Sequence, residues 1–257
     1  MNVLVFDIET VPDTKSAETI WDVGGLSESD IKSFLSTSRL QETSGRSDFL
    51  KHHLHKIVSI SVAIRSKNTF KLWSLGEESS TEKELLERFF SGIEKYEPTL
   101  VSWNGSGFDL PVIHYRALLH EVSSPLYWEV GVNKKEFRFN NYQSRYHNRH
   151  LDLMDILSGY NPGAYARLDQ IACMCGFPGK MGLSGGDVSE KYSNGQISDI
   201  RNYCETDVLN TWLVYLKFEL MRGNLDRIEY EEELNITLKF LKTANSSHFD
   251  EFQTALE

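Results

Sequence analysis

The stretch Val3-Leu-Val-Phe-Asp7-Ile-Glu9-Thr10 decides the fold, because a run of apolar residues is interrupted there by two carboxylates. Such a run predicts a strand buried on both faces in the centre of a helix-covered sheet. Residues i and i+2 of a strand point to the same side, so Asp7 and Glu9 are expected to converge. Two buried anions need a cation, and we expect a divalent metal ion. Taken alone, the same pair also fits two solvated side chains at a strand end.

Composition bounds the class of protein. A chain of 257 residues with 40% hydrophobic and 12% aromatic residues suits one large domain, with or without an appendage. No apolar run approaches the roughly 20 residues that span a bilayer. The chain begins with a predicted strand instead of a signal sequence. We therefore expect a cytoplasmic protein without a membrane partner. Cys173 and Cys175 are expected to pack in the core. A net charge of -10 argues against indiscriminate coating of nucleic acid.

The hydrophobic periodicity predicts an α/β protein with a mixed sheet flanked by helices. Strands are expected over residues 3–8, 56–64, 70–75, 99–103 and 150–153, and helices over 80–96, 109–120, 168–175 and 198–222. Thr81 and Glu84 have the spacing of a capping box at the start of the first helix.

Three segments fall outside that scheme. The polar insertion 13–54 is too long for an ordinary loop and is expected to include short helices, and a second insertion, 121–149, is aromatic and basic near its end. After Asp226 we expect a charged amphipathic helix, followed from about Thr243 by a polar segment that frays.

Two later segments share the character of the first. In the stretch from Asn104 to Phe108 a Gly-rich turn follows an apolar strand, and Asp109 then stands where a helix begins, either as a cap or as a site residue. Tyr203 and Asp207 are four residues apart on an apolar helix, so they share one face. A carboxylate on that face needs a partner in the core, and the expected metal would supply it.

Together, Asp7-x-Glu9, Asn104-x-x-x-Phe108-Asp109 and Tyr203-x-x-x-Asp207 resemble the three exonuclease motifs of the DEDD superfamily in its tyrosine subclass. The Phe-Asp-Ile-Glu-Thr opening and the Asn-Gly-x-x-Phe-Asp-Leu-Pro run are most similar to the 3′-to-5′ proofreading domain of B-family DNA polymerases, and to stand-alone bacterial proteins predicted as exonucleases from that likeness. The resemblance covers about residues 1–222 as the exonuclease domain and leaves 223–257 as a C-terminal helical extension.

The resemblance implies a ribonuclease-H-like fold and two Mg²⁺ or Mn²⁺ ions. It implies that Asp7, Glu9 and Asp207 hold the tighter ion, that Asp7 with Asp109 surrounds the second, and that Tyr203 orients the attacking water. The implied activity is 3′-to-5′ hydrolysis of single-stranded DNA ends to nucleoside 5′-monophosphates, for DNA repair or end trimming. Three alternatives stay open: a 3′-to-5′ exoribonuclease acting on RNA, a non-catalytic nucleic-acid-binding module, and a structural network of acidic residues paired with Lys or Arg.

Further residues are candidates for gripping the substrate. Asn104 is expected to hydrogen-bond a base or sugar, Phe108 to stack on a base or pack in the core, and Thr10 to contact the terminal 3′ end or serve as a turn hydroxyl. Asp152 matches a recurrent acidic position of the family with a supporting or structural role. Residues 134–149 interleave five basic residues with four aromatics, which predicts either a single-strand platform or a solvated β-hairpin.

Overall fold

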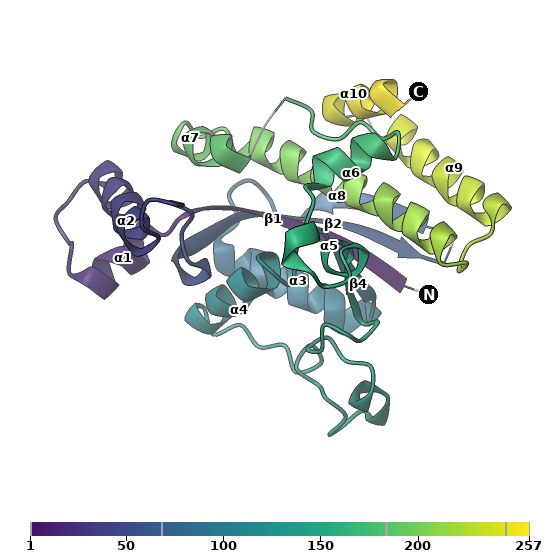
Figure 1. Ribbon diagram of the computed structural model, residues 1–257, viewed down its shortest axis with the longest axis horizontal. Coiled ribbons are helices and arrows are strands. Elements are labelled where there is room, and N and C mark those ends of the chain that lie inside the picture. The colour runs from purple at the N-terminus through teal and green to yellow at the C-terminus, as the bar shows by residue number, and fades with distance from the viewer. Residues whose placement is uncertain (1, 68, 183–184, 245, 257) are drawn as a thin grey trace.

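Five strands in the order β3-β2-β1-β4-β5 form the central sheet of the computed structural model, which describes residues 2–67, 69–182, 185–244 and 246–256 (Figure 1). β1 pairs antiparallel with β2, and β2 with β3, whereas β4 runs parallel to both β1 and β5. The strands are β1 Asn2–Pro12, β2 His55–Ser66, β3 Thr69–Ser74, β4 Thr99–Ser102 and β5 His150–Asp152. This mixed sheet confirms the predicted α/β class and is consistent with a ribonuclease-H-like domain.

Helices cover both faces of the sheet (Figure 1). The longer helices are α3 Glu82–Tyr96 and α4 Asp109–Leu119 on one face, and α8 Ile197–Met221 and α9 Arg227–Thr243 on the other, where the short helix α6 Leu168–Met174 also packs against α8. Shorter elements are η1 His52–Leu54, η2 Lys135–Arg138, α5 Leu153–Leu157, η3 Pro162–Ala164, η4 Gly185–Asp187 and α7 Val188–Ser193. The predicted strands and helices are confirmed, and Thr81 and Glu84 form the predicted capping box. The largest difference is at β1, which continues to Pro12.

The alternation of side chains along β1 places the candidate site. Val3 and Val5 pack into the core beneath α8, whereas Leu4, Phe6 and Ile8 pack into the core beneath α3 and α4. Because successive residues of a strand point to opposite faces, Asp7 continues the row of Val3 and Val5. Its side chain therefore faces α8, the helix that carries the third predicted motif.

The insertion 13–54 folds on itself beside the sheet. It contains α1 Thr14–Trp21 and α2 Glu28–Glu42, which confirms the expected helices. Ala17, Ile31 and Leu35 form a small buried cluster between them, at one end of the molecule (Figure 1).

The C-terminal segment was expected to fray, and that prediction is wrong. Residues Ser247–Leu256 form a helix, α10, in which Phe249 and Phe252 are buried against the core beneath α8. His248 Nε2 lies 2.8 Å from Glu205 Oε2 on α8. The segment is polar along most of its length, so the helix depends on these few contacts with α8 and α9. The division of the chain at residue 222 stays a prediction.

Two smaller expectations concern cysteines and membranes. Cys173 is exposed and Cys175 half-buried, so the expectation that the pair packs in the core is wrong for Cys173, whose Sγ lies 3.6 Å from the Pro178 carbonyl at the turn after α6. Within the described ranges, no helix has both the length and the apolar character needed to cross a bilayer.

Candidate active site

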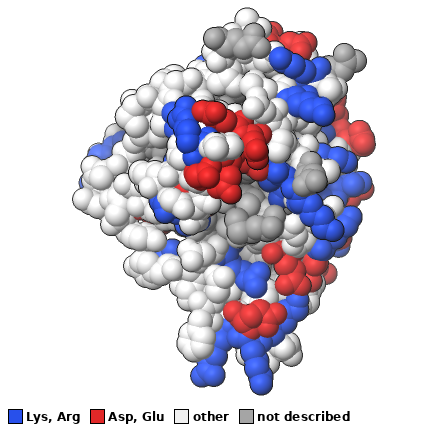
Figure 2. All heavy atoms as spheres, turned by 90° about the vertical axis from the view of Figure 1, so that its right-hand side faces the viewer, with Lys and Arg blue, Asp and Glu red and all other residues white. Residues whose placement is uncertain are grey.

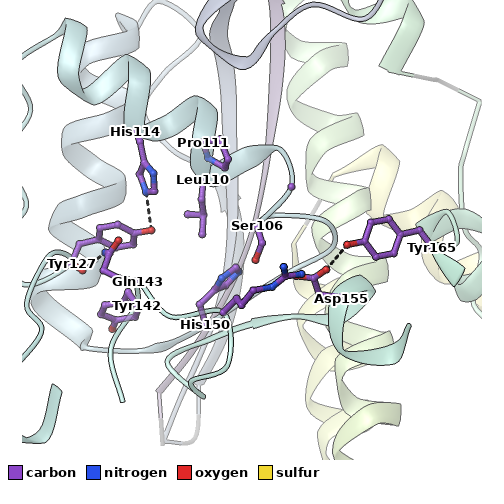
Figure 3. Close-up of a pocket in the computed structure, with 12 residues that line it drawn as sticks. Ser106, Leu110, Pro111, His114, Tyr127, Tyr142, Gln143, His150, Asp155 and Tyr165 are labelled. Atoms are coloured by element: carbon purple, nitrogen blue, oxygen red, sulfur yellow. Dashed lines mark hydrogen bonds and ion pairs between the residues drawn. The ribbon is translucent and has the colours of Figure 1, made fainter. Parts of the chain in front are cut away.

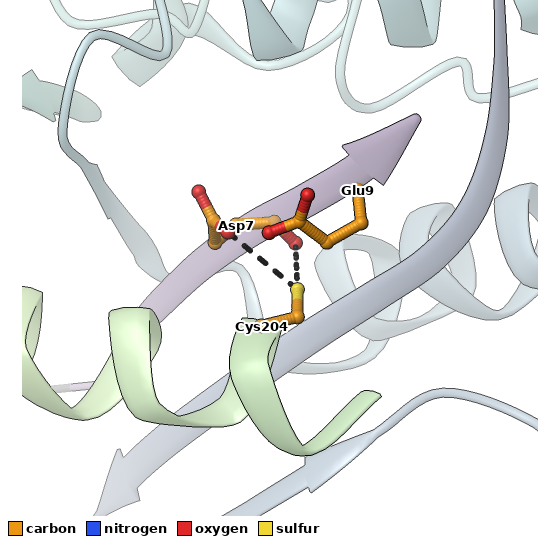
Figure 4. A group of neighbouring side chains, drawn as sticks. All are labelled: Asp7, Glu9 and Cys204. Atoms are coloured by element: carbon orange, nitrogen blue, oxygen red, sulfur yellow. Dashed lines mark hydrogen bonds between the residues drawn. The ribbon is translucent and has the colours of Figure 1, made fainter. Parts of the chain in front are cut away.

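Asp7 and Glu9 converge at the centre of β1, as their spacing predicts. Together with Cys204 of α8 they offer ligand atoms that all lie within 4.8 Å of one another (Figure 4). The Cys204 Sγ is fully buried and donates to the Asp7 main-chain oxygen at 3.4 Å and to its Oδ2 at 3.5 Å. The spacing of the motifs does not predict a role for Cys204, because position i+1 of a helix points away from the face that Tyr203 and Asp207 share.

A cavity of about 420 Å³ opens beside this pair. Its wall is drawn from β1, from the turn after β4, from the start of α4 and from α8. Six of the residues singled out in the sequence line it: Asp7, Asn104, Phe108, Asp109, Tyr203 and Asp207. The fold therefore brings the three motifs, whose neighbours in sequence are about a hundred residues apart, to one cavity.

The turn of the second motif is held by a carboxylate from β5. Asp152 accepts hydrogen bonds from the backbone N–H groups of Asn104 at 2.9 Å and Ser106 at 2.8 Å. Asn104 adopts a left-handed conformation with φ 65°, and a side chain at Gly107 would collide with the Asn104 amide. Asp152 thus has the structural role that was one of its two expected roles, since it fixes the turn that presents Asn104.

Asp109 is not a helix cap. It is the first residue of α4, after Phe108 in the N-cap position, where no side chain caps the helix. Its Oδ1 instead accepts a hydrogen bond from the Ile8 N–H at 3.2 Å. That bond crosses from β1 to α4, so the carboxylate is oriented by the strand that carries Asp7 and Glu9.

Burial and mutual repulsion shape the charge of the site. Burial, followed by the charges of the neighbouring carboxylates, raises the pKa of Asp7 and of Glu9 well above the ordinary values. Burial raises the pKa of Asp109 to about 7, and raises that of Asp207 to about 6 against a hydrogen bond from Tyr203 and the charge of Lys180. Four carboxylates are thus held in a place that disfavours their ionised form.

Lys180 is a site residue that sequence reasoning missed. It lines the cavity with its Nζ 5.7 Å from the centre of the Tyr203 ring, and its charge lowers the pKa of both Glu9 and Asp207. Asn210 of α8 holds the preceding Gly179 by two hydrogen bonds, at 3.1 Å to its N–H and 2.8 Å to its carbonyl. The one sequence signal for Lys180 is its position directly after Gly179, which is typical of a turn.

The site does not resemble the alternative of a structural network in which each acidic residue is paired with Lys or Arg. Among the residues that the structure describes, the cavity is lined by one basic residue besides Lys180, which is Arg167, and this residue is paired with Asp169 at 3.3 Å. One lysine among four carboxylates leaves most of the negative charge uncompensated.

Phe108 and Thr10 occupy different surroundings. The half-buried Phe108 ring lies 5.1 Å from the His55 ring and 5.5 Å from the Phe49 ring, and it also lines the cavity. Thr10 does not line this cavity; its hydroxyl lies 2.9 Å from His55 Nδ1, across the antiparallel pair of β1 and β2. Thr10 therefore lies within β1, and the expectation of a turn hydroxyl is wrong.

Comparisons with known proteins agree with this geometry. Residues 47–256 match the model of a family described as predicted 3′-to-5′ exonucleases related to the exonuclease domain of PolB. Among curated proteins, the chain is similar to the catalytic subunits of DNA polymerase epsilon from Emericella nidulans and from Aspergillus fumigatus. Each is 24% identical over 142 residues, which are 53% of this chain and 6% of the fungal protein.

The chain thus matches only a small part of these polymerase subunits, whereas the family model covers most of the chain and all but the first motif. With its mixed five-stranded sheet and its converging carboxylates, the chain belongs to the family of predicted 3′-to-5′ exonucleases related to the exonuclease domain of PolB.

Proposed function

We propose that this protein hydrolyses single-stranded DNA from the 3′ end to nucleoside 5′-monophosphates, with two Mg²⁺ or Mn²⁺ ions held by Asp7, Glu9, Asp109 and Asp207. The observation that carries the proposal is the convergence of four carboxylates with raised pKa values: Asp7, Asp109 and Asp207 line one cavity, and Glu9 lies beside Asp7. The fold is destabilised by this arrangement unless cations occupy it. DNA is favoured over RNA because the similar curated proteins are DNA polymerase subunits.

The donor set fits hard divalent ions. Carboxylate oxygens are the ligands that Mg²⁺ and Mn²⁺ prefer, and the thiol of Cys204, whose pKa burial and the Asp7 charge raise, stays protonated and is a poor competitor. When bound, a pair of such ions supplies positive charge that stabilises the attacking and leaving oxygens of an in-line displacement at phosphorus.

The protein's own groups would orient the reactants. Burial, followed by the neighbouring carboxylates, raises the pKa of Tyr203 far above its ordinary value, so its hydroxyl keeps its proton. It would therefore position the water through a hydrogen bond and would not act as a base. Lys180 would attract the scissile phosphate into the cavity, and Asn104 and Phe108 would contact the terminal nucleotide. Repair or trimming of DNA 3′ ends is the role that we infer for this reaction.

The test is hydrolysis of 5′-labelled single-stranded DNA and RNA of one sequence, with Mg²⁺, Mn²⁺ or EDTA. We expect a ladder that shortens from the 3′ end of the DNA, that needs the metal and that is lost in Asp7→Ala. The matched control is Asp199→Asn, which removes a carboxylate from the exposed start of the same helix α8. Faster cleavage of RNA would make the protein an exoribonuclease. Absence of cleavage, with oligonucleotide binding retained, would leave a non-catalytic binding module.

A further inference from the structure

Residues 134–149 carry five basic residues and one acidic residue in a chain whose net charge is -10. The segment forms the short helix η2 and then a series of bends, with no strand between residues 134 and 149, so the predicted β-hairpin is wrong. It lies below the sheet and leads into β5 (Figure 1). Figure 2 shows Lys and Arg side chains gathered at the lower end of the molecule. The net charge of residues 134–149 is thus positive, opposite to that of the whole chain.

Two aromatic residues anchor the segment to the body of the protein. Phe137 is fully buried, and the Arg149 guanidinium lies 3.8 Å from the centre of its ring. Tyr142 is 2% exposed and its hydroxyl donates to the Pro98 carbonyl at 2.7 Å. The surface that the segment presents is therefore held in place by buried contacts.

The other two aromatic residues point outward. Phe139 is 80% exposed and Tyr146 is 71% exposed. Arg138 lies 5.5 Å from the centre of the Phe139 ring, and Arg145 lies 5.9 Å from that of Tyr146. Exposed rings paired with guanidinium groups match the way single-stranded nucleic acid is held, because bases stack on rings while cations attract phosphates.

This surface is adjacent to the candidate active site. Arg145 Nη2 pairs with Asp155 Oδ2 at 2.6 Å, and Asp155 Oδ1 accepts a hydrogen bond from the Tyr165 hydroxyl at 2.6 Å (Figure 3). Arg145 and Tyr165 both line a second cavity, of about 350 Å³. Tyr165 also lines the cavity of the carboxylates. Tyr165 thus joins the two cavities, and Arg145, which lines the second cavity, precedes the exposed Tyr146 in the chain.

We propose that Phe139, Tyr146 and Arg138 form a platform that binds the nucleotides of single-stranded nucleic acid 5′ of the scissile bond. The inference rests on the proposed function, since it says where the rest of the strand lies when its 3′ end is in the catalytic cavity.

The ion pairs of residues 134–149 show which of their basic side chains are available to bind phosphate groups. Lys134 is paired with Glu97, and Arg145 with Asp155. Lys135 and Arg138 form no ion pair with any residue that the structure describes. The proposal therefore assigns phosphate contacts to Lys135 and Arg138 and stacking to the two exposed rings.

Binding tests the platform independently of catalysis. Fluorescence anisotropy in EDTA would compare labelled oligo-thymidylates of 4 and 12 nucleotides. For the 12-mer we expect the Kd of Phe139→Ala/Tyr146→Ala to rise by about 30-fold or more, because each of the two lost stacking contacts is worth roughly 1 to 3 kcal/mol. Arg138→Ala should reduce the slope of log Kd against log salt by about 0.7, the value for one lost contact with a single strand. The 4-mer, which offers few nucleotides beyond those in the catalytic cavity, should be affected less.

The matched controls are Trp73→Ala and Lys71→Ala, an exposed ring and an exposed cation on β3, at the opposite edge of the sheet from β5. Both should bind the 12-mer as the wild type does. Unchanged 12-mer affinity in the platform variants would overturn the inference, as would equal losses in the controls. Binding of the platform to anionic lipid vesicles in preference to the 12-mer would overturn it too.

A small substrate separates this inference from the proposed function. Hydrolysis of the p-nitrophenyl ester of thymidine 5′-monophosphate by the wild-type protein, with Asp7→Asn as the inactive control, reports on the catalytic cavity without upstream nucleotides. Hydrolysis together with variant-independent 12-mer binding would refute only the platform. No hydrolysis of this ester or of DNA, together with variant-dependent binding, would refute only the proposed exonuclease.

Discussion

The backbone N–H of Ile8 donates a hydrogen bond to Oδ1 of Asp109 at 3.2 Å. This bond ties the strand of the first motif to the helix of the second, across about a hundred residues of sequence. It leaves the other oxygen of Asp109 for the cavity, which the residue lines. An asparagine at this position would keep the bond from Ile8 and lose the negative charge.

We therefore expect Asp109→Asn to fold normally and to lose activity. Exonuclease activity should fall by about a hundredfold or more, as when one preorganised electrostatic group is removed from an active site. The melting temperature in EDTA should not decrease, since the bond to Ile8 is retained. Hydrolysis of labelled DNA measures the activity, and thermal unfolding measures the stability. If Asp109→Asn were as active as the wild type, Asp109 would have no role in catalysis.

Asp7→Asn should stabilise the protein in the absence of metal. Burial, followed by the charges of Asp109, Glu9 and Asp207, raises the pKa of Asp7, so its ionised form opposes folding near neutral pH. Removing that charge should raise the free energy of unfolding in EDTA, because the folded state then no longer holds this anion among like charges. Urea unfolding measures the change.

The same variant should lose the response to metal. Mg²⁺ or Mn²⁺ should raise the melting temperature of the wild type, because a ligand that binds only the folded state stabilises it, and should raise that of Asp7→Asn little. An Asp7→Asn protein less stable than the wild type in EDTA would contradict the account of repulsion within the site.

Tyr203→Phe should slow the reaction with little effect on binding. The ring still packs with Ile200 and lies beside Lys180, whereas the hydroxyl that donates to Asp207 is lost. We expect kcat to fall about a hundredfold, within the range for a positioned proton-bearing group, and KM to change little. Steady-state kinetics with a 12-mer would separate the two constants, and a change in KM alone would assign Tyr203 to substrate binding.

Arg116 joins the polar insertion to the sheet domain. Its guanidinium, 4% exposed, pairs with Asp13 and with Glu82, whose Oε2 lies 2.6 Å from Nη2. Arg116→Met would remove the cation that two buried carboxylates share, leaving Glu82 with His120 at 2.8 Å as its remaining ion-pair partner, so the free energy of unfolding should fall by about 3 kcal/mol. Glu82→Gln combined with Arg116→Met should recover part of the loss in urea unfolding. Additive losses in the double variant would contradict the pairing.

His150 is buried in a place that disfavours its protonated form. Burial lowers its pKa to about 4, and its Nε2 lies 2.8 Å from Ser102 Oγ. Since the unfolded value is near 6.5, the folded protein binds fewer protons between pH 6.5 and 4. The contribution of His150 to the free energy of unfolding therefore decreases as pH falls through this window, by about 2 kcal/mol at pH 5.

The variant His150→Gln isolates that contribution. It should be less stable than the wild type at pH 7.5, and its stability should depend less on pH between 6.5 and 5. Burial raises the pKa of Asp109 to about 7 and that of Asp207 to about 6. These carboxylates stabilise the fold as pH falls over the same window, but they act in both proteins and cancel in the comparison. Parallel stability curves for the two proteins would show that His150 does not titrate in this window.

The sequence by itself determined the elements and the membership of the three motifs. The pattern around Asp7 and Glu9 specifies a buried strand with both carboxylates on one face, and the spacing of Tyr203 and Asp207 specifies a shared helical face. These predictions depend on backbone geometry alone, because the repeat of a strand or a helix relates residues that are close in the chain. Local geometry of this kind can be deduced without knowing the fold.

Only the tertiary structure decided which residues outside the motifs join the site. Lys180 and Cys204 are part of the site. The Thr10 hydroxyl contacts His55 instead of the cavity. The polar end of the chain forms a helix that contacts α8 through His248 and its neighbours. Each of these outcomes depends on contacts between segments that the sequence separates by tens to hundreds of residues. No local pattern encodes such a contact, because its free energy arises from the packing of two surfaces that exist only once both segments have folded.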